Sequence, residues 1–244
     1  MILARILLVA ASAVVVVVAC ALTWWTFGSY KPDAVAEAAM SGATDEGGWY
    51  EFGGRESRTG IVLYPGARVD AEAYAPLASE LSEQTGATVA VVRVPLDMAL
   101  LDGDAAEEVI AVHPEVLRWT MAGHSLGGVA AAAYAEERAG KTVDGLLLFA
   151  SYPSGGTDLS NGQVEVVSIL GSRDGVLDRR SFEEAKSRLP EHTDYVEIEG
   201  MNHAQFGSCG PQEGDGKPTV TDERAVLEVV AASKDLVQGG AGIR

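Results

Sequence analysis

Cysteine is scarce in this sequence, which limits both disulfides and cysteine-based metal sites. The 244 residues include two cysteines, Cys20 in an apolar N-terminal stretch and Cys209 toward the C-terminus. We do not expect these two to meet, and no cysteine or histidine has the spacing of a metal-binding motif. The sequence therefore predicts no disulfide, no metal and no other cofactor. A domain of this size does not need a disulfide, so its absence does not argue against export.

Basic residues are also few, with 18 lysines and arginines against 35 aspartates and glutamates and a formal net charge of −17. An acidic surface repels nucleic acid and anionic lipid headgroups, so we expect no nucleic-acid partner. Once an apolar N-terminus is set aside, about 200 residues remain, which is enough for one α/β domain with a sizeable core.

The first 30 residues contain one charged side chain, Arg5, and the run from Ile6 to Trp25 contains none. A helix of that length spans roughly 30 Å, the thickness of the hydrocarbon core of a bilayer. Trp24 and Trp25 close the run, and tryptophan favours the membrane–water interface. The sequence thus predicts a single-pass anchor in residues 1–30, with the catalytic domain on the extracytoplasmic side of the cell membrane.

Two other interpretations of this stretch stay open. Ala19-Cys20-Ala21 offers the small residues of a signal-peptide cleavage site. Val17-Val18-Ala19-Cys20 resembles a relaxed lipobox, in which Cys20 would carry a lipid. Beyond this stretch, residues 31–48 are small, polar and acidic, and we expect a linker there that includes a short helix around residues 34–40.

Residues 49–244 alternate short apolar runs with helical patterns and are expected to form one domain. The expected strands are 49–52, 60–64, 88–94, 117–122, 145–150, 164–170 and 195–199, and the expected helices follow Asp70 and cover 105–112, 129–135, 182–189 and 221–237. This alternation predicts the α/β class, with a mostly parallel, doubly wound sheet and an antiparallel first strand. No long insertion follows Ala150, where a lid domain would enter.

One segment of this pattern carries a reactive-serine motif. Gly123-His124-Ser125-Leu126-Gly127 has the form G-x-S-x-G and lies between the buried strand 117–122 and the Ala-rich helix 129–135. A sharp turn from strand to helix places the serine on a strained corner, with its hydroxyl outside the sheet. This context favours Ser125 as a nucleophile over an incidental serine in a glycine-rich turn.

A serine hydroxyl needs a base within hydrogen-bonding reach, and that base needs an acid to orient it. In parallel sheets such groups lie on loops at the carboxyl ends of strands. Asp174 follows strand 164–170, and His203 follows strand 195–199. The chain order Ser125, Asp174, His203 is the order that this geometry requires, so these three are the predicted catalytic residues.

Other residues compete for these roles. The alternative role of Asp174 is a structural one, in which it shapes an Asx turn and takes no part in catalysis. Asp178 is either the alternative acid or the cap of the next helix. Among the other histidines, His113 precedes a proline on an expected surface loop. His124 lies inside the elbow and points away from Ser125, and His192 lies in a polar turn.

Acyl transfer also needs two N–H donors for the oxyanion of the tetrahedral intermediate. The first should be the backbone N–H of Leu126, directly after the nucleophile, and the second that of Ala67, on the loop after the first core strand. Gly66 and Arg68 flank Ala67 and are candidate substrate-binding residues. Gly66 allows the close turn, and Arg68 either binds an anionic substrate group or is an ordinary surface residue. We expect further pocket walls from loops 96–103 and 206–218.

Four segments of this chain resemble the α/β-hydrolase fold superfamily, and more narrowly its small lidless fold-5 type with an N-terminal membrane anchor. They are Tyr64-Pro-Gly-Ala-Arg-Val-Asp70, Ala122-Gly-His-Ser-Leu-Gly-Gly128, Gly171-Ser-Arg-Asp-Gly-Val176 and Gly200-Met-Asn-His-Ala-Gln-Phe-Gly207. The resemblance covers about residues 49–237. It implies the α/β-hydrolase fold, with the triad and the oxyanion hole at the residues already named.

The expected function is a serine hydrolase that cleaves carboxylic ester or lactone bonds through an acyl-serine intermediate. Its substrate is expected to be a small-molecule or lipid ester, and the N-terminal segment is expected to join it to a membrane. Two alternatives stay open. A membrane-anchored acyltransferase would use the same acyl-serine but exclude water, and a non-catalytic binding scaffold could use the same fold. An intact triad argues against the scaffold.

Overall fold

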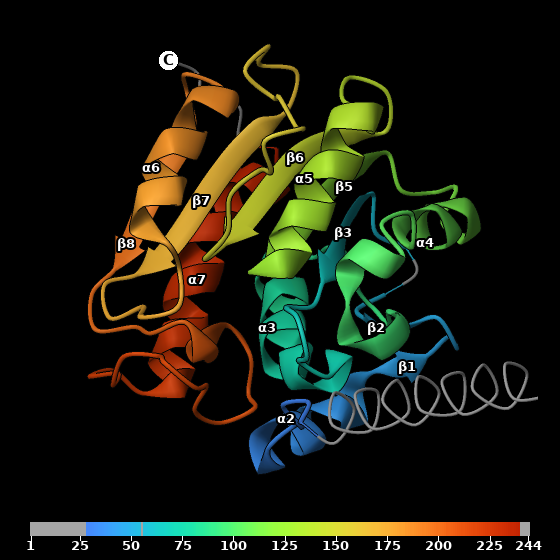
Figure 1. Cartoon of the computed structure of the whole chain (residues 1–244). Coiled ribbons are helices and arrows are strands. Elements are labelled where there is room, and N and C mark those ends of the chain that lie inside the picture. The colour runs from blue at the N-terminus through green and yellow to red at the C-terminus, as the bar shows by residue number, and fades with distance from the viewer. Residues whose placement is uncertain (1–27, 55, 240–244) are drawn as a thin grey trace, which may run out of the picture.

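The computed structural model describes residues 28–54 and 56–239, in which helices cover both faces of one sheet (Figure 1). In these residues the sheet has eight strands in the order β1-β2-β4-β3-β5-β6-β7-β8. The strands are β1 Thr44–Asp45, β2 Trp49–Phe52, β3 Thr59–Tyr64, β4 Thr88–Val92, β5 Arg118–His124, β6 Val143–Phe149, β7 Glu165–Gly171 and β8 Asp194–Ile198. Strands β3 to β8 pair in parallel, whereas β1 and β2 are antiparallel to their neighbours. The predicted α/β class and the antiparallel first strand are confirmed.

The helices follow the strands in the order that the sequence predicts. They are α2 Ala34–Ala39, α3 Ala75–Thr85, α4 Ala106–Val112, α5 Leu126–Arg138, α6 Arg179–Ala185 and α7 Asp222–Val237. Short 3₁₀ turns are η1 Met40–Gly42, η2 Ala71–Tyr74, η3 Pro95–Asp97, η4 Ala99–Leu101, η5 Lys186–Arg188 and η6 Ala204–Phe206. Asp70 caps η2 by accepting a hydrogen bond from the Glu72 N–H, so the predicted helix start after Asp70 is confirmed.

Two hydrophobic clusters fill the space between the sheet and its helices. Along β3, Ile61 and Leu63 belong to the cluster shared with α3 and α7, whereas Val62 belongs to the one shared with α4 and α5. All three side chains are fully buried. Successive side chains of a strand point to opposite faces, so a strand covered on both faces must be apolar throughout. This explains the continuous apolar runs of the central strands.

Strand β5 and helix α5 come closer to Ser125 than the sequence pattern predicts. β5 extends to His124 and α5 begins at Leu126, so Ser125 alone makes the turn. The arrows of β6 and β7 in Figure 1 point toward the lower end of the molecule. Because β5, β7 and β8 are parallel to β6, the loops after these strands meet at that same edge of the sheet.

His113 precedes a loop with exposed residues, as predicted, but its own side chain is buried and does not lie at the surface. Its side chain is 4% exposed, with Nε2 2.9 Å from Glu51 Oε2 and Nδ1 2.9 Å from Glu115 Oε1. These two contacts join β2 to the connection between α4 and β5, and they give polar partners to a histidine that the sequence pattern placed in solvent.

Residues 31–48, predicted as a linker with a short helix, and the three described residues before them contact the α/β domain. The short helix is confirmed as α2, and its Ala36 is fully buried. Before it, the Tyr30 N–H donates to the Arg68 carbonyl at 2.6 Å, and the Tyr30 carbonyl accepts from the Asp70 N–H at 3.0 Å. These two bonds fix the start of the described chain to the loop after β3.

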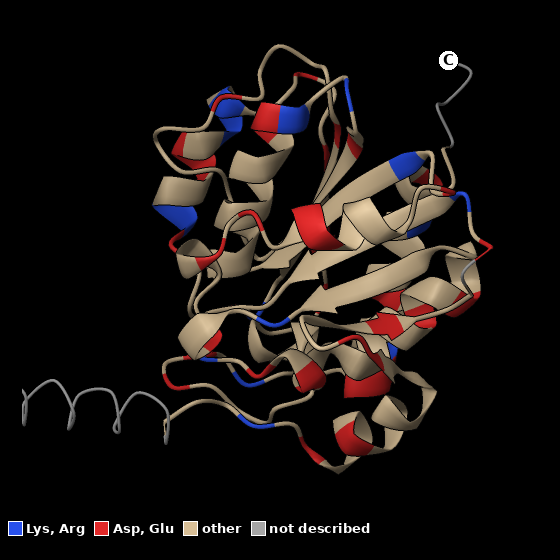
Figure 2. Ribbon diagram, turned by 90° about the vertical axis from the view of Figure 1, so that its right-hand side faces the viewer, with Lys and Arg blue, Asp and Glu red and all other residues tan. Residues whose placement is uncertain are grey.

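The anchor predicted for residues 1–30 falls almost entirely on residues 1–27, which lie outside the described residues. Within the described ranges, no helix is both long enough and apolar enough to cross a bilayer. Figure 2 shows aspartates and glutamates spread over helices and loops, with fewer lysines and arginines between them. In this view the acidic residues are thus spread over several elements.

Candidate active site

Ser125 occupies a strained turn at the carboxyl end of β5. Its φ of 51° and ψ of −121° lie outside the regions that a residue with a side chain usually adopts. Its N–H donates to the Phe149 carbonyl at 2.9 Å, and its carbonyl accepts from the Ser151 hydroxyl at 2.6 Å. An added Cβ would collide with the backbone of α5 at Gly123, and with the backbone of Tyr64 and Pro65 at Gly127, so the two glycines let α5 begin close to the ends of β5 and β3.

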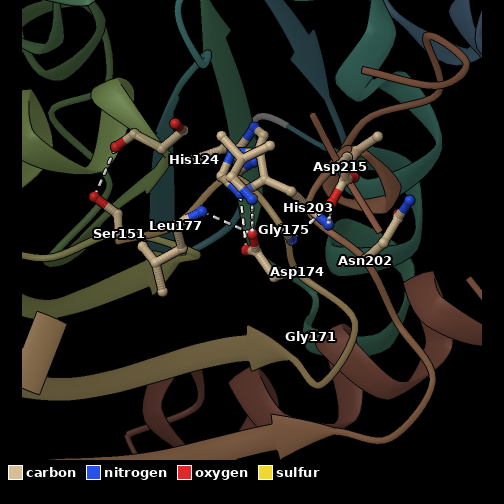
Figure 3. Close-up of polar contacts among 12 residues, drawn as sticks. His124, Ser151, Gly171, Asp174, Gly175, Leu177, Asn202, His203 and Asp215 are labelled. Carbon is tan, nitrogen blue, oxygen red and sulfur yellow. Dashed lines mark hydrogen bonds and ion pairs between the residues drawn. The ribbon is translucent and has the colours of Figure 1, made fainter. Parts of the chain in front are cut away.

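Asp174 and His203 form a buried pair (Figure 3). The Nδ1 atom of His203 lies 2.8 Å from Oδ2 of Asp174, and the two side chains are 2% and 0% exposed. The other carboxylate oxygen accepts the N–H groups of Val176 and Leu177, both at 2.8 Å. Asp174 therefore also shapes an Asx turn, the structural role that was its alternative in the sequence analysis. Asp178 accepts from the Ser181 N–H and caps α6.

The surroundings of Asp174 favour its ionised form. Burial alone would raise the pKa of this carboxyl. The hydrogen bond to His203 and the adjacent imidazole, with the N–H groups of Leu177 and Val176, outweigh burial and lower the pKa below its ordinary value. An ionised Asp174 can only accept from His203 Nδ1–H, so the proton of a neutral ring is held on Nδ1 and Nε2 is left as the basic atom.

Asp215 ties the loops of Asp174 and His203 together, and sequence analysis did not identify it. Its Oδ1 accepts the N–H of Gly175 at 3.1 Å and of His203 at 3.2 Å, and its Oδ2 accepts the N–H of Ala204 at 2.8 Å (Figure 3). One carboxylate thus joins the backbone after β7 to the backbone after β8. In the sequence it is one aspartate in a polar, glycine-rich loop, and such loops give no sign of long-range contacts.

A second histidine ring lies beside the His203 ring. The ring centroids of His124 and His203 are 4.5 Å apart, and Phe206 stacks against His124 at 5.3 Å. Burial first, and then the neighbouring His203, lower the pKa of His124 well below 6.5. His124 is therefore neutral at physiological pH, and it does not oppose a positive charge on His203.

His124 also takes part in a hydrogen-bonded chain that reaches the Ala67 loop. Its Nδ1 lies 2.8 Å from the Tyr74 hydroxyl, which in turn accepts the Gly66 N–H at 2.8 Å. A Cβ at Gly66 would lie 2.9 Å from His124 Nδ1 and 3.1 Å from the Tyr74 oxygen. The glycine is thus needed for this close approach, and its N–H is used within the protein.

The two predicted oxyanion donors carry N–H groups that no atom of the described residues accepts. Among the described residues, neither Ala67 N–H nor Leu126 N–H makes a hydrogen bond. Leu126 is also the first residue of α5, where N–H groups are free and the helix dipole favours negative charge. Arg68, beside Ala67, directs its guanidinium to the Gly28 carbonyl and lies 6.0 Å from the Tyr30 ring centroid. This contact was not foreseen for Arg68.

Ser125 and His203 line one open pocket of about 250 Å³. The other lining residues are Leu126, Val129, Ala150, Ser151, Tyr152, Val176, Leu177 and Asp178. The expectation that loops 96–103 and 206–218 form these walls was wrong. The walls come instead from the residues after β6 and β7, and residues 207–218 line a separate cavity of about 380 Å³. No hydrogen bond joins the Ser125 hydroxyl to His203 in the described chain, which is common in catalytic sites without substrate.

Metal ligation is not evident at this site, since the described residues hold no cluster of three or more histidine, cysteine, aspartate or glutamate side chains suited to a metal ion. What the arrangement offers is a serine on a strained turn, an oriented imidazole, a carboxylate and two free N–H groups at one edge of the sheet. These are the groups used in nucleophilic acyl transfer.

Comparisons with known proteins agree with this fold. An esterase from Pyrobaculum calidifontis is 15% identical over 85% of this chain and 89% of its own, with a TM-score of 0.54. A predicted CIB-like hydrolase from Thermoplasma acidophilum is 16% identical over 77% of this chain and 92% of its own, also with a TM-score of 0.54. Mouse alpha/beta hydrolase domain-containing protein 10 is 12% identical over 79% and 95% of the two chains, with a TM-score of 0.55.

At these identities the structural likeness shows the fold alone. No curated protein matches the sequence significantly. The sequence model described as "Alpha/beta hydrolase family" matches residues 60–226, from the strand before Ala67 to the beginning of α7 and across all the predicted site residues. The resemblance inferred from the four sequence segments is confirmed at the level of the superfamily. The chain belongs to the α/β hydrolase family.

Proposed function

We propose that this protein is a serine hydrolase of carboxylic esters or lactones, with Ser125 as nucleophile, His203 as general base and Asp174 as the acid that orients it. The observation that carries the proposal is the buried Asp174–His203 hydrogen bond of 2.8 Å, with His203 lining the same pocket as Ser125. If Asp174 and His203 only stabilised the fold, His203 would not have to line a pocket together with a serine on a strained turn.

In the first half of the reaction, Ser125 Oγ attacks the carbonyl carbon of the ester and its proton passes to His203 Nε2. The oxyanion that forms is stabilised by the N–H groups of Ala67 and Leu126. The tetrahedral intermediate then collapses, and the alcohol leaves with the proton from Nε2. Asp174 holds the imidazole in the required tautomer and stabilises its positive charge.

In the second half, water gives a proton to His203 Nε2 and attacks the acyl-serine. The second tetrahedral intermediate releases the carboxylic acid, and the proton returns to Ser125 Oγ. A neutral His124 beside His203 suits both halves, since a second cation at 4.5 Å between ring centroids would oppose protonation of the base. No step needs a metal or an organic cofactor.

The pocket favours an apolar acyl or alkyl group near Ser125. Val129, Val176 and Leu177 contribute aliphatic side chains to a space of about 250 Å³, which suits a small substrate or one end of a larger one. The esterase from Pyrobaculum calidifontis shares the fold and supports the choice of esters. We therefore propose small-molecule or lipid esters as substrates.

We also propose that residues 1–30 anchor the protein in the cell membrane, with residues 49–244 forming the extracytoplasmic hydrolase domain. The support is the uncharged run from Ile6 to Trp25, together with Arg5 before it. Fractionation of cells that express the full chain would test this. Recovery in the membrane fraction after a carbonate wash is expected, and recovery in the soluble fraction would contradict it.

Turnover of short-chain p-nitrophenyl esters by the full chain tests the catalytic proposal. Ser125→Ala should abolish turnover above the rate in buffer, while Ser160→Ala, an exposed serine outside the pocket, should leave it unchanged. Both variants should keep the wild-type circular dichroism spectrum. Undiminished turnover in folded Ser125→Ala would refute the assignment of the nucleophile.

A further inference from the structure

We propose that the edge of the domain that carries the active site faces a lipid bilayer, and that the site takes esters partitioned into that bilayer. This inference rests on the proposed function and on the proposed anchor. Neither of those proposals says which face of the domain meets the membrane. The path of the chain into the domain and the apolar side chains beside the oxyanion loop supply that orientation.

The described chain begins beside the proposed oxyanion hole. The Arg68 guanidinium donates a hydrogen bond to the Gly28 carbonyl, and Arg68 directly follows Ala67. Two residues later, Tyr30 makes backbone hydrogen bonds of 2.6 and 3.0 Å to the same loop. Gly28 is therefore attached to the segment whose N–H would bind the oxyanion.

The apolar run ends very close to this attachment point. Thr26 and Phe27 are the two residues between Trp25 and Gly28. An extended chain covers at most about 3.6 Å per residue, so an anchor that ends at Trp25 can end no more than about 11 Å from Gly28. A bilayer that holds Ile6 to Trp25 must then have its surface about that near to the oxyanion loop. With an anchor that ends at Trp25, the chain between anchor and domain is too short to hold the domain away from the membrane.

The neighbouring loop presents apolar side chains at the same edge. The Asp97 carbonyl accepts the Arg68 N–H at 2.8 Å, which places η3 and η4 beside the oxyanion loop. Here Leu96, Leu100 and Leu101 are 41%, 53% and 58% exposed. Large aliphatic side chains exposed together in this way are suited to burial in the interfacial layer of a bilayer.

Exposure alone does not identify the membrane face. Leu117 is 66% exposed, but it lies just before β5, whereas Ser125 lies just after that strand. A strand of seven residues is about 23 Å long. Leu117 is thus far from the edge to which Gly28 is attached, and it serves as a matched control for Leu100 and Leu101.

The first experiment compares two substrates with the full chain in phosphatidylcholine vesicles. One is p-nitrophenyl butyrate in the aqueous phase, and the other is p-nitrophenyl palmitate dissolved in the vesicles. Leu100→Glu/Leu101→Glu should lower the ratio of palmitate to butyrate turnover at least tenfold, while Leu117→Glu should leave the ratio within twofold of wild type. Equal ratios in all three proteins would overturn the inference. Loss of butyrate turnover in the wild type would instead refute the proposed function.

The second experiment measures bilayer contact without using activity. Tryptophan is introduced at each position as Leu100→Trp or Leu117→Trp, and the full chain is placed in vesicles of brominated phosphatidylcholine. The added tryptophan fluorescence should be quenched in Leu100→Trp and not in Leu117→Trp. Equal fluorescence of the two added tryptophans would show that this edge does not touch lipid, whatever the enzyme hydrolyses.

Discussion

Replacement of Asp215 by alanine should impair catalysis although Asp215 does not line the Ser125 pocket. The change removes a carboxylate that accepts backbone N–H groups from Gly175, His203 and Ala204. Each hydrogen bond to a charged group is worth about 1.5–3 kcal/mol, and water can replace part of this in a half-buried loop. We expect the free energy of unfolding to fall by about 3 kcal/mol.

The kinetic effect follows from the position of His203. Without Asp215, the loops after β7 and β8 lose their shared anchor, and a displacement of about 1 Å at a catalytic group costs roughly 100-fold in rate. We therefore expect kcat for a short p-nitrophenyl ester to fall about 100-fold with KM within twofold. Asp215→Asn keeps one acceptor oxygen, so its kcat should fall only about tenfold.

Glu213→Ala is the matched control, since it removes one exposed acid from the same loop. It should leave kcat, KM and the urea midpoint at wild-type values. A wild-type kcat and a wild-type urea midpoint in Asp215→Ala would show that Asp215 does not hold the two loops in place. An equal loss of kcat in Glu213→Ala would show that loop charge, and not the joining of the two loops, is responsible.

Three further predictions concern the histidines and the oxyanion loop. Asp174→Asn should lower kcat about 10³- to 10⁴-fold with little change in KM, because an amide does not hold the imidazole tautomer; steady-state kinetics would decide. Gly66→Ala should cost about 1–3 kcal/mol in urea unfolding, because its Cβ would lie 2.9 Å from His124 Nδ1, whereas Gly155→Ala, with open space around it, should cost little. Because the pKa of His124 is lowered in the folded protein, His124 binds a proton below pH 6.5 in the unfolded chain but stays neutral in the folded protein. As the pH is lowered below 6.5, the free energy of unfolding should fall by up to about 1.4 kcal/mol per pH unit in the wild type and by less in His124→Gln. Equal pH slopes of the free energy of unfolding in the two proteins, measured by urea titration, would contradict this.

Much of the fold and the members of the candidate site could be predicted from local patterns. Residues 60–64 form a strand with buried side chains on both faces, so their continuous apolar run was an unambiguous signal. The serine, the acid and the base each follow a strand of the same parallel sheet. Their proximity thus follows from topology once the strands are known, without any knowledge of side-chain contacts.

The remaining features depend on contacts between residues distant in the chain, and local patterns do not encode these. Asp215 accepts from Gly175, 40 residues earlier, and His113 pairs with Glu51, 62 residues earlier. A polar residue in a polar loop looks the same whether it faces solvent or a buried partner. The walls of the pocket were misplaced for the same reason, since loop conformation decides which side chains reach Ser125.

The most direct test of the central claim is covalent labelling of the full chain with a fluorophosphonate, followed by peptide mass spectrometry. This reagent reacts with a serine that a neighbouring base has activated, so its reaction reports the assembled triad independently of substrate choice. We expect one adduct per chain, on the peptide that contains Ser125, and no adduct in His203→Ala. Folded wild-type protein that stays unlabelled, or an adduct on another serine, would contradict it.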